Sequence, residues 1–397
     1  MKVADRSVRN RPGSLSAESR ATSPAIVGVG TSVPATSYSQ RELLDLFGIT
    51  DPRVRSIFLN SAIERRALTL PPPLPDGSMP VETQGQLLAK HVTSGVALGR
   101  RAVEDCLRAA GATLADVRYL CCVTSTGLLT PGFSALLIKE LGIDRHCARL
   151  DVVGMGCNAG LNGLTSVASW AAAHPGELAL LVCIEACSAA YVMDGTMRSA
   201  VVNSLFGDGS AAAAVVAPPT ATATATATAT GAVAATGAAA PAATGPAGTP
   251  AGPALLRFSS CIVPEASAAM RYDWDDERGK FSFYLDPDIP YVVGAHAEPS
   301  LDRLLEGTGL NRSDISHWVI HSGGKKVVDS VRVNLGLTRR DVRHTTGVLR
   351  DHGNLSSGSF LFSYRRLAAE ACAEPGDFGV LMTMGPGATI ELALVGW

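Results

Sequence analysis

The chain has 397 residues, of which 46% are hydrophobic and 18% are charged, and its formal net charge is −2. This length and composition are sufficient for a large core built from more than one domain. The near-neutral charge excludes the strongly basic field of a typical nucleic-acid-binding protein. Nine cysteines are scattered without the paired spacing of a zinc site, so we expect no metal, and free thiols in a reducing cytoplasm.

Two segments differ in composition from the rest of the chain. Residues 1–24 are rich in Arg and Ser and lack the apolar core of a secretory signal, which predicts a flexible N-terminal arm; an organelle transit peptide is the alternative. Residues 217–254 are almost wholly Ala, Thr, Pro and Gly, which predicts a disordered insertion between halves at 25–216 and 255–397. The alternative for this segment is that its Ala-Thr alternation pairs as a strand.

Strand and helix patterns alternate along both halves. In the first half, apolar runs predict strands at 25–30, 117–124, 178–185 and 211–216, and helical patterns cover 82–110 and 161–173. In the second half, we expect strands at 255–263, 317–321, 378–384 and 389–396, and helices at 298–309, 324–335 and 357–373. This alternation predicts a layered α/β architecture. No run of about twenty uncharged apolar residues predicts a membrane span.

Cys157 is the strongest candidate for a reactive residue. It follows an apolar run, lies between glycines at 154, 156 and 160, and precedes the helical pattern of 161–173. A strand, a tight turn and a helix start would place it at a helix N-terminus, where unpaired N–H groups favour a thiolate. The pattern predicts a lowered pKa and covalent catalysis. The alternative is a small buried residue in a packed turn.

Two further motifs support a catalytic interpretation. His321 is followed by Ser-Gly-Gly at the end of a predicted strand, and Asn354 follows Gly353 at a predicted strand–helix junction. A histidine and an asparagine in such turns can direct N–H donors at one point. Together with Cys157 they form a plausible nucleophile with two oxyanion donors.

With the runs Leu-Phe-Gly-Asp-Gly at 205–209 and Gly-Pro-Gly at 385–387, these motifs resemble the type III polyketide synthases, or chalcone-synthase-like enzymes. The run around Cys157 most resembles the bacterial 3,5-dihydroxyphenylacetyl-CoA synthases of glycopeptide-antibiotic pathways. The resemblance implies a thiolase fold of two stacked α-β-α-β-α halves, and a homodimer. It implies that malonyl-CoA is starter and extender, that no cofactor is needed, and that accessory pathway proteins assist release and aromatisation.

The resemblance also implies residue roles. Cys157 would carry the growing acyl chain, His321 and Asn354 would hold the thioester carbonyl of malonyl-CoA as CO₂ leaves, and His321 would keep Cys157 ionised as its ion-pair partner. Other positions would contact the substrate. The gatekeepers would be Phe206 and Phe283; the cavity candidates are Ser125, Thr126 and Thr130, with the turn Gly385, Pro386 and Gly387; the candidates for the CoA phosphates are Arg53, Arg55, Arg65, Arg66, Lys325 and Lys326.

Two departures from the plant enzymes argue against a flavonoid-type product. Thr130 stands where plant enzymes often have a methionine that reaches into the partner's cavity, and Thr383 stands where they usually have a glycine. Alternative functions are alkylresorcinol or tetrahydroxynaphthalene synthesis, an initiating ketoacyl synthase, a Cys-His-Asn hydrolase, and a thiolase-fold partner subunit without catalysis. The ketoacyl synthases usually have Gln-Ala-Asn after the histidine, which differs from the Ser-Gly-Gly seen here.

Overall fold

The computed structural model describes residue 15 and residues 17–192, 196–219 and 252–397. Its main element is a nine-stranded sheet with the strand order β11-β12-β13-β8-β1-β7-β6-β4-β5. The strands of the first half are β1 (Ala25–Ser32), β4 (Val117–Thr124), β5 (Ala148–Val153), β6 (Leu178–Glu185) and β7 (Gly209–Val216). Those of the second half are β8 (Ala254–Ile262), β11 (Ile315–Ile320), β12 (Phe378–Gly385) and β13 (Thr389–Gly396).

The two halves repeat one topology. In the first half, β4 is parallel to β6, which is antiparallel to β7, which is antiparallel to β1. In the second half, β11 is likewise parallel to β12, which is antiparallel to β13, which is antiparallel to β8. The halves join where Ala25 of β1 pairs with Ala254 of β8. The sequence shows no clear repeat, so this symmetry is visible only in the strand pairing.

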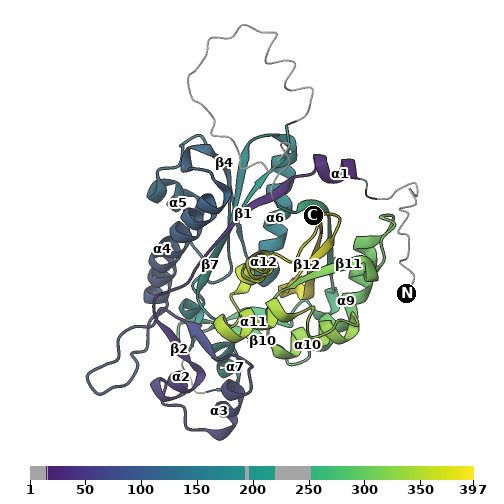
Figure 1. The fold of residues 1–397 in the computed structure, drawn as a ribbon. Helices are drawn as coiled ribbons and strands as arrows, with labels where there is room; N and C mark the ends of the chain where they lie inside the picture. Colours follow the sequence, from purple (N-terminus) through teal and green to yellow (C-terminus); the bar gives the residue numbers. More distant parts are fainter. Residues whose placement is uncertain (1–14, 16, 193–195, 220–251) are drawn as a thin grey trace.

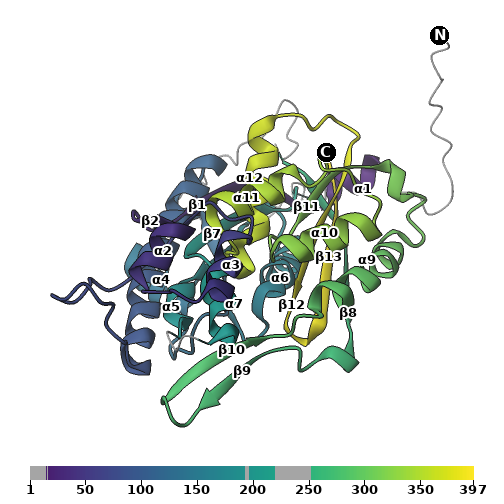
Figure 2. The same cartoon turned by 90° about the horizontal axis from the view of Figure 1, so that it is seen from below.

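Helices form three layers around the two parts of the sheet (Figures 1 and 2). The central layer is α6 (Ala159–Ala173) and α12 (Ser359–Glu370), which share one apolar cluster with strands of both halves. Helices α4 (Gln84–Ala110) and α5 (Phe133–Leu141) cover the first half, and α9 (Ile289–Leu305) and α10 (Lys325–Asn334) cover the second. The expected α-β-α-β-α thiolase fold is therefore confirmed.

Burial explains the continuous apolar strands. Every residue of β6 and β7 is buried because helices cover both faces of the sheet there. The central helices also come very close to the neighbouring turn. A Cβ atom at Gly160 of α6 would lie 2.1 Å from the carbonyl oxygen of Ser357, so only glycine allows this approach. This contact brings the starts of α6 and α12 together.

The predicted boundaries hold for most elements but not for all. Part of the expected N-terminal arm is the helix α1 (Ala17–Thr22), whose Arg20 stacks 5.3 Å from the ring centre of Phe378; residues 1–14 lie outside the described part. Most of the predicted insertion, residues 220–251, also lies outside it. Helix α9 begins nine residues before the predicted 298, because Pro290 fits the first turn, and it continues through Pro299.

Short elements without strong periodicity escaped the sequence interpretation. They are α5, β5, the helices α2 (Gln40–Leu46), α3 (Pro52–Leu59), α7 (Met197–Leu205) and α11 (Arg343–His352), the antiparallel pair β2 (Ser37–Ser39) and β3 (Arg65–Ala67), and the hairpin of β9 (Met270–Asp275) and β10 (Lys280–Leu285). The β9–β10 hairpin projects from the second half and lies below the sheet in Figure 2. None of the described helices combines the length and apolar character required to cross a membrane.

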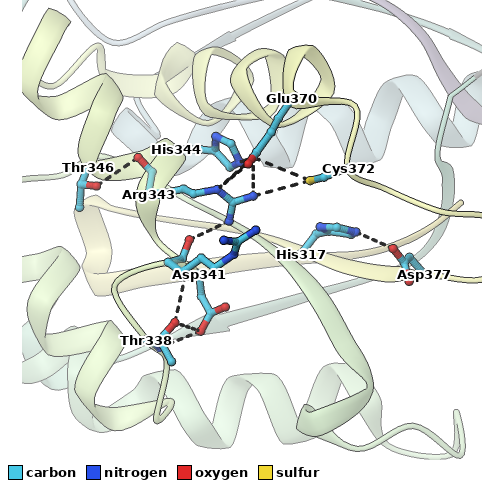
Figure 3. Close-up of polar contacts among 10 residues, drawn as sticks. His317, Thr338, Asp341, Arg343, His344, Thr346, Glu370, Cys372 and Asp377 are labelled. Atoms are coloured by element: carbon cyan, nitrogen blue, oxygen red, sulfur yellow. Dashed lines mark hydrogen bonds and ion pairs between the residues drawn. The ribbon is translucent and has the colours of Figure 1, made fainter.

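Polar contacts orient α11, the helix that leads to Asn354 (Figure 3). His344 of α11 lies 2.9 Å from the carboxylate of Glu370 at the end of α12, and Arg343 pairs with the same carboxylate. His317 of β11 contacts Asp377, directly before β12, at 2.8 Å. Partly exposed ion pairs contribute roughly 0–1 kcal/mol each, so their main effect is orientation rather than stability.

Candidate active site

Cys157 lies in a short 3-10 turn, η2 (Gly156–Asn158), between β5 and α6. The prediction of a helix start at this residue is confirmed. Gly156 has a φ of +80°, and a Cβ there would lie 2.3 Å from the ring of Pro386. Only glycine accommodates both constraints. The turn at residues 385–387 therefore packs directly against the nucleophile turn, η2, which carries Cys157. The sulfur is held in a buried position, with Cys157 9% exposed.

The electrostatics of Cys157 differ from the prediction. Burial raises the pKa of its thiol to about 12, although the hydrogen bond from Ser356 acts in the opposite direction. The predicted lowering of this pKa is therefore wrong for the free protein, because the desolvation of a thiolate outweighs the N–H groups of the turn. Burial also lowers the pKa of His321 to about 3, so the imidazole is neutral. The expected resting ion pair is corrected to a thiol and a neutral imidazole.

His321 follows the last residue of β11 and is 2% exposed. Its backbone N–H donates to the carbonyl of Met382 in β12 at 2.8 Å, which continues the parallel ladder. In the described part of the chain, its side-chain Nδ1 has no hydrogen-bond partner. A buried nitrogen of this kind is available to a ligand.

Asn354 lies at a different kind of junction from the one predicted. It connects α11 with the turn η6 (Ser356–Gly358) and α12, so two helices meet there rather than a strand and a helix. Gly353, with a φ of +72°, ends α11 and starts this turn. The Nδ2 group of Asn354 donates to the carbonyl of Gly323 at 3.4 Å, and its Oδ1 accepts the N–H of Ser356 at 2.8 Å.

The structure connects the three predicted catalytic residues through neighbouring groups: Ser356 links Asn354 to Cys157, and Gly323 links Asn354 to the turn that follows His321. The hydroxyl of Ser356 donates to Sγ of Cys157 at 3.4 Å, and the backbone N–H of Ser356 donates to Oδ1 of Asn354 at 2.8 Å. Gly323 accepts from the Asn354 amide, and a Cβ on Gly323 would lie 3.0 Å from the ring of His321. The imidazole of His321 and the amide of Asn354 therefore both lie next to Gly323.

A cavity of about 640 Å³ opens beside Cys157. Several predicted substrate residues line it. They are Ser125, Thr126, Phe206, Phe283, Pro386 and Gly387. The rings of Phe206 and Phe283, from α7's end and from β10, meet edge to face with centroids 6.0 Å apart and planes at 90°. Two aromatic residues that are far apart in the sequence thus form one wall of the cavity.

Other predicted substrate residues lie elsewhere. Gly385 packs behind the cavity, where a Cβ would lie 2.2 Å from Oδ1 of Asn158. Thr130 is exposed, and it is not among the residues that line the cavity within this chain. Thr383 is fully buried, and its hydroxyl donates to the carbonyl of Asn158 at 3.5 Å. Both Gly385 and Thr383 therefore support the nucleophile turn from behind.

The predicted CoA-contacting residues do not line the described cavity. Arg53 and Arg55 belong to α3, and Arg55 donates to the carbonyl of Ile49 at 2.9 Å. Lys325 and Lys326 are exposed at the start of α10, and Lys325 pairs with Asp329 at 2.8 Å. These groups remain available to an anion only at the outer surface.

Arg65 and Arg66 need separate treatment. Arg65 donates to the backbone carbonyl of Ser37 at 2.8 Å. Arg66 is completely buried and donates to Gln40 at 2.8 Å and to the carbonyl of Phe206. A contact between Arg66 and CoA phosphates is therefore excluded, because its guanidinium faces the interior. Arg66 instead fixes the backbone of the aromatic wall.

The sequence interpretation missed a buried carboxyl group behind the nucleophile. Glu185, at the end of β6, is completely buried and accepts from both the N–H and the hydroxyl of Ser125 at 3.0 Å. The Ser125 hydroxyl lies 2.7 Å from that of Ser356, which reaches Cys157. Burial raises the pKa of Glu185 to about 7. A lone glutamate at the end of an entirely apolar strand was the available signal.

Comparison with known proteins identifies the family. The chain matches the model of the N-terminal domain of chalcone and stilbene synthases over residues 72–219 and that of the C-terminal domain over residues 256–396. It is 64% identical to a 3,5-dihydroxyphenylacetyl-CoA synthase of Streptomyces toyocaensis, covering 97% of this chain and 94% of that protein. It is 31% identical to a 1,3,6,8-tetrahydroxynaphthalene synthase of Streptomyces peucetius subsp. caesius, covering 94% and 93%.

Solved structures agree with this assignment. The type III polyketide synthase domain of a hybrid synthase from Dictyostelium superposes with a TM-score of 0.80 at 26% identity, covering 94% of this chain and 99% of that one. The tetrahydroxynaphthalene synthase of Streptomyces coelicolor A3(2) has the same fold, with a TM-score of 0.79 at 24% identity and coverage of 94% and 99%. With its two matched domains and its thiolase fold, the chain belongs to the chalcone and stilbene synthase family of type III polyketide synthases.

Proposed function

We propose that this protein condenses four molecules of malonyl-CoA and cyclises the product to 3,5-dihydroxyphenylacetyl-CoA, a precursor for glycopeptide antibiotics. The observation that carries the product is the 64% identity with the Streptomyces toyocaensis enzyme of that name over 97% of the chain. The carbon balance agrees: four three-carbon malonyl units that lose four molecules of CO₂ leave an eight-carbon acyl group. Ring closure within the chain leaves the CoA thioester intact.

Cys157 carries the acyl chain in this proposal. Its sulfur attacks the thioester carbonyl, the new carbon–sulfur bond forms, and the bond to the CoA sulfur breaks. The proton of the Cys157 thiol leaves with the CoA thiol, so charge is conserved. Because the free thiol is protonated at neutral pH, proton transfer has to accompany this attack. The hydroxyl of Ser356, 3.4 Å away, is a group that can hydrogen-bond the sulfur while its charge changes.

His321 and Asn354 serve the decarboxylation step. The bond between the malonyl carbon and its carboxylate breaks, CO₂ leaves, and the electron pair moves toward the thioester oxygen. The neutral imidazole of His321 and the amide of Asn354 can each present an N–H to this oxygen. The enolate carbon then attacks the acyl carbonyl on Cys157, the carbon–carbon bond forms, and the Cys157 sulfur is released. A neutral histidine suits this role because it is needed as a donor and not as an acid.

The proposal includes a substrate route past the aromatic wall. Phe206 and Phe283 line the cavity and meet edge to face, which supports their proposed role as gatekeepers between the site and the CoA moiety. Gly324, directly before Lys325 and Lys326, approaches Leu205, the neighbour of Phe206, because a Cβ on Gly324 would lie 3.4 Å from its side chain. This places the start of α10 next to the aromatic wall. Lys325, Lys326, Arg53 and Arg55 are therefore the proposed partners of the CoA phosphates.

We extend the proposal to the setting of the enzyme. We expect a homodimer in which Thr130 approaches the partner's cavity. We also expect that the enzyme needs no metal or redox cofactor, and that accessory proteins assist release and aromatisation. All nine cysteines are free thiols, which supports a reducing cytoplasm.

Product analysis tests the reaction. The purified protein is incubated with malonyl-CoA alone, and the products are identified by mass spectrometry and NMR. We expect 3,5-dihydroxyphenylacetyl-CoA; tetrahydroxynaphthalene or pyrones as the only products would refute the product while leaving the family intact.

Substitutions test the roles of the residues. Cys157→Ala should abolish condensation, and His321→Ala or Asn354→Ala should each slow it roughly a hundredfold to a thousandfold, the typical effect of removing one oxyanion donor. A loss of less than about threefold for both would show that these two residues are structural.

A further inference from the structure

Arg198 joins α7 of the first half to the β9–β10 hairpin of the second half. Its guanidinium Nη2 donates to the carboxylate of Asp273 in β9 at 2.7 Å and to the backbone carbonyl of Ser282 in β10 at 3.4 Å. Asp273 and Ser282 are direct cross-strand partners. One side chain therefore contacts both strands of the hairpin at the same pair, and both Figure 1 and Figure 2 show α7 beside β10.

Two further residues of the hairpin extend this contact into a network. Arg271 donates to the other carboxylate oxygen of Asp273 at 2.8 Å. The guanidinium groups of Arg198 and Arg271 lie 5.2 Å and 4.4 Å from the centre of the Tyr284 ring. Because these groups share partners, the loss of Arg198 removes an ion pair, a hydrogen bond and a cation–π contact together.

The strand pair that Arg198 contacts is next to the gatekeeper Phe283. Phe283 directly follows Ser282 in β10. Successive side chains of a strand point to opposite faces, so the Phe283 ring and the Asp273 side chain lie on opposite faces of the hairpin. Phe283 lines the cavity, and Arg198 is not among the described residues that line it. Arg198 therefore holds the hairpin from its outer face.

The other end of α7 meets the hairpin on the cavity side. Phe206 directly follows α7, and its ring packs edge to face on Phe283 with centroids 6.0 Å apart. Arg198 lies in the first turn of the same helix, whose nine residues span about 13 Å. A short helix thus contacts the hairpin on both faces. The spacing of the two aromatic rings consequently depends on the contact at Arg198.

We propose that Arg198 is a positioning residue that holds the hairpin against α7 and so limits access to Cys157 past the Phe206–Phe283 wall. This inference rests on the proposed gatekeeper role of the two rings, but not on the identity of the product. The ion pair is partly exposed, with 39% of the Arg198 side chain and 34% of the Asp273 side chain accessible. Salt weakens such a pair, so access to Cys157 should widen as the ionic strength rises.

Labelling of Cys157 by maleimides of two sizes provides the test. N-methylmaleimide is the small probe and N-(1-pyrenyl)maleimide is the bulky one, so the same thiol chemistry applies to both. Peptide mapping by mass spectrometry gives the labelling rate at Cys157. Arg198→Gln should raise the ratio of bulky to small labelling by about fivefold, the most that one exposed ion pair contributes to an equilibrium. Arg198→Lys retains the charge and should keep the rise below about twofold.

Asp273→Asn tests the same contact from the hairpin. It should also raise the ratio, and adding Arg198→Gln to it should have no further effect, because both substitutions remove the same interaction. Potassium chloride at about 1 M should raise the ratio in the wild type and not in Arg198→Gln. Arg303→Gln is the matched control: it breaks an exposed ion pair with Glu306, 3.0 Å long, and should leave the ratio unchanged.

Two results would overturn the proposal: an unchanged ratio in both Arg198→Gln and Asp273→Asn, or an equal rise in Arg303→Gln, which would indicate general loosening. If circular dichroism shows that one of the first two variants does not fold, the other variant and the salt response of the wild type decide. The outcome is separable from that of the proposed function. A wild type that makes another product from malonyl-CoA, while loss of Arg198 still raises the ratio, refutes the product and retains the role of Arg198.

Discussion

The hydroxyl of Ser356 donates to Sγ of Cys157 at 3.4 Å and lies 2.7 Å from the hydroxyl of Ser125. Through Ser125, the contact reaches the buried carboxyl of Glu185. The nucleophile is therefore surrounded by hydroxyl groups and a carboxyl group with a raised pKa, and not by a resting cation. This arrangement accounts for a thiol that stays protonated until a substrate arrives.

The reactivity of Cys157 should reflect its raised pKa. Because burial moves this pKa to about 12, the rate of alkylation by iodoacetamide should rise steadily from pH 7 to pH 10 without a plateau. Ser356→Ala should slow the alkylation further, because the hydrogen bond from Ser356 stabilises the thiolate and the variant lacks it. Peptide mapping by mass spectrometry separates Cys157 from the partly exposed Cys261 and Cys372. A plateau near pH 7 would contradict the raised pKa.

Glu185 should make the fold less stable as the pH rises. Its pKa is raised from 4.5 to about 7, so between these values the native state binds more protons than the unfolded state. The free energy of unfolding must then fall with rising pH, by a total of roughly 3 kcal/mol from this group. Glu185→Gln should remove this slope, as measured by urea denaturation at pH 5 and pH 8. Glu104→Gln, at a partly exposed site, is the control and should retain it.

Gly156→Ala should destabilise the nucleophile turn through two separate effects. The φ of +80° costs a non-glycine residue roughly 1–2 kcal/mol, and contact with the Pro386 ring at 2.3 Å adds roughly 1–3 kcal/mol of overpacking. Gly142→Ala isolates the first effect, because Gly142 has a φ of +68° and no atom within 4 Å of an added Cβ. Chemical denaturation of both variants should show the larger loss at Gly156; equal losses would refute the steric contact.

Residues 220–251 should be dispensable for the fold. The ends of the segment are close, because Val216 of β7 and Ala254 of β8 both pair with Ala25, on opposite edges of β1. Strands two positions apart are separated by about 10 Å, which a bridge of about four residues can span. A protein with residues 220–251 replaced by a short Gly/Ser bridge should keep its thermal midpoint and its rate of Cys157 acylation. Loss of either property would show that the segment contributes to the folded enzyme.

The local sequence determined the elements and the reactive residues. Cys157 between glycines, His321 before Gly-Gly and Asn354 after Gly353 could be recognised because tight turns demand glycine at specific positions. The buried strands β6 and β7 could be recognised because strands covered on both faces are continuously apolar. The order of these elements was sufficient for the layered fold and, through the family resemblance, for its thiolase topology.

Only the tertiary structure decided the electrostatics and the neighbours. Desolvation raises the pKa of Cys157 and lowers that of His321, and a local helix-end argument cannot include burial by distant residues. The roles of Arg66 and Glu185 likewise depend on partners more than fifty residues away, such as Phe206 and Ser357. The local sequence pattern indicates backbone geometry and apolar faces. The charge state of a buried group depends instead on all the residues that pack around it.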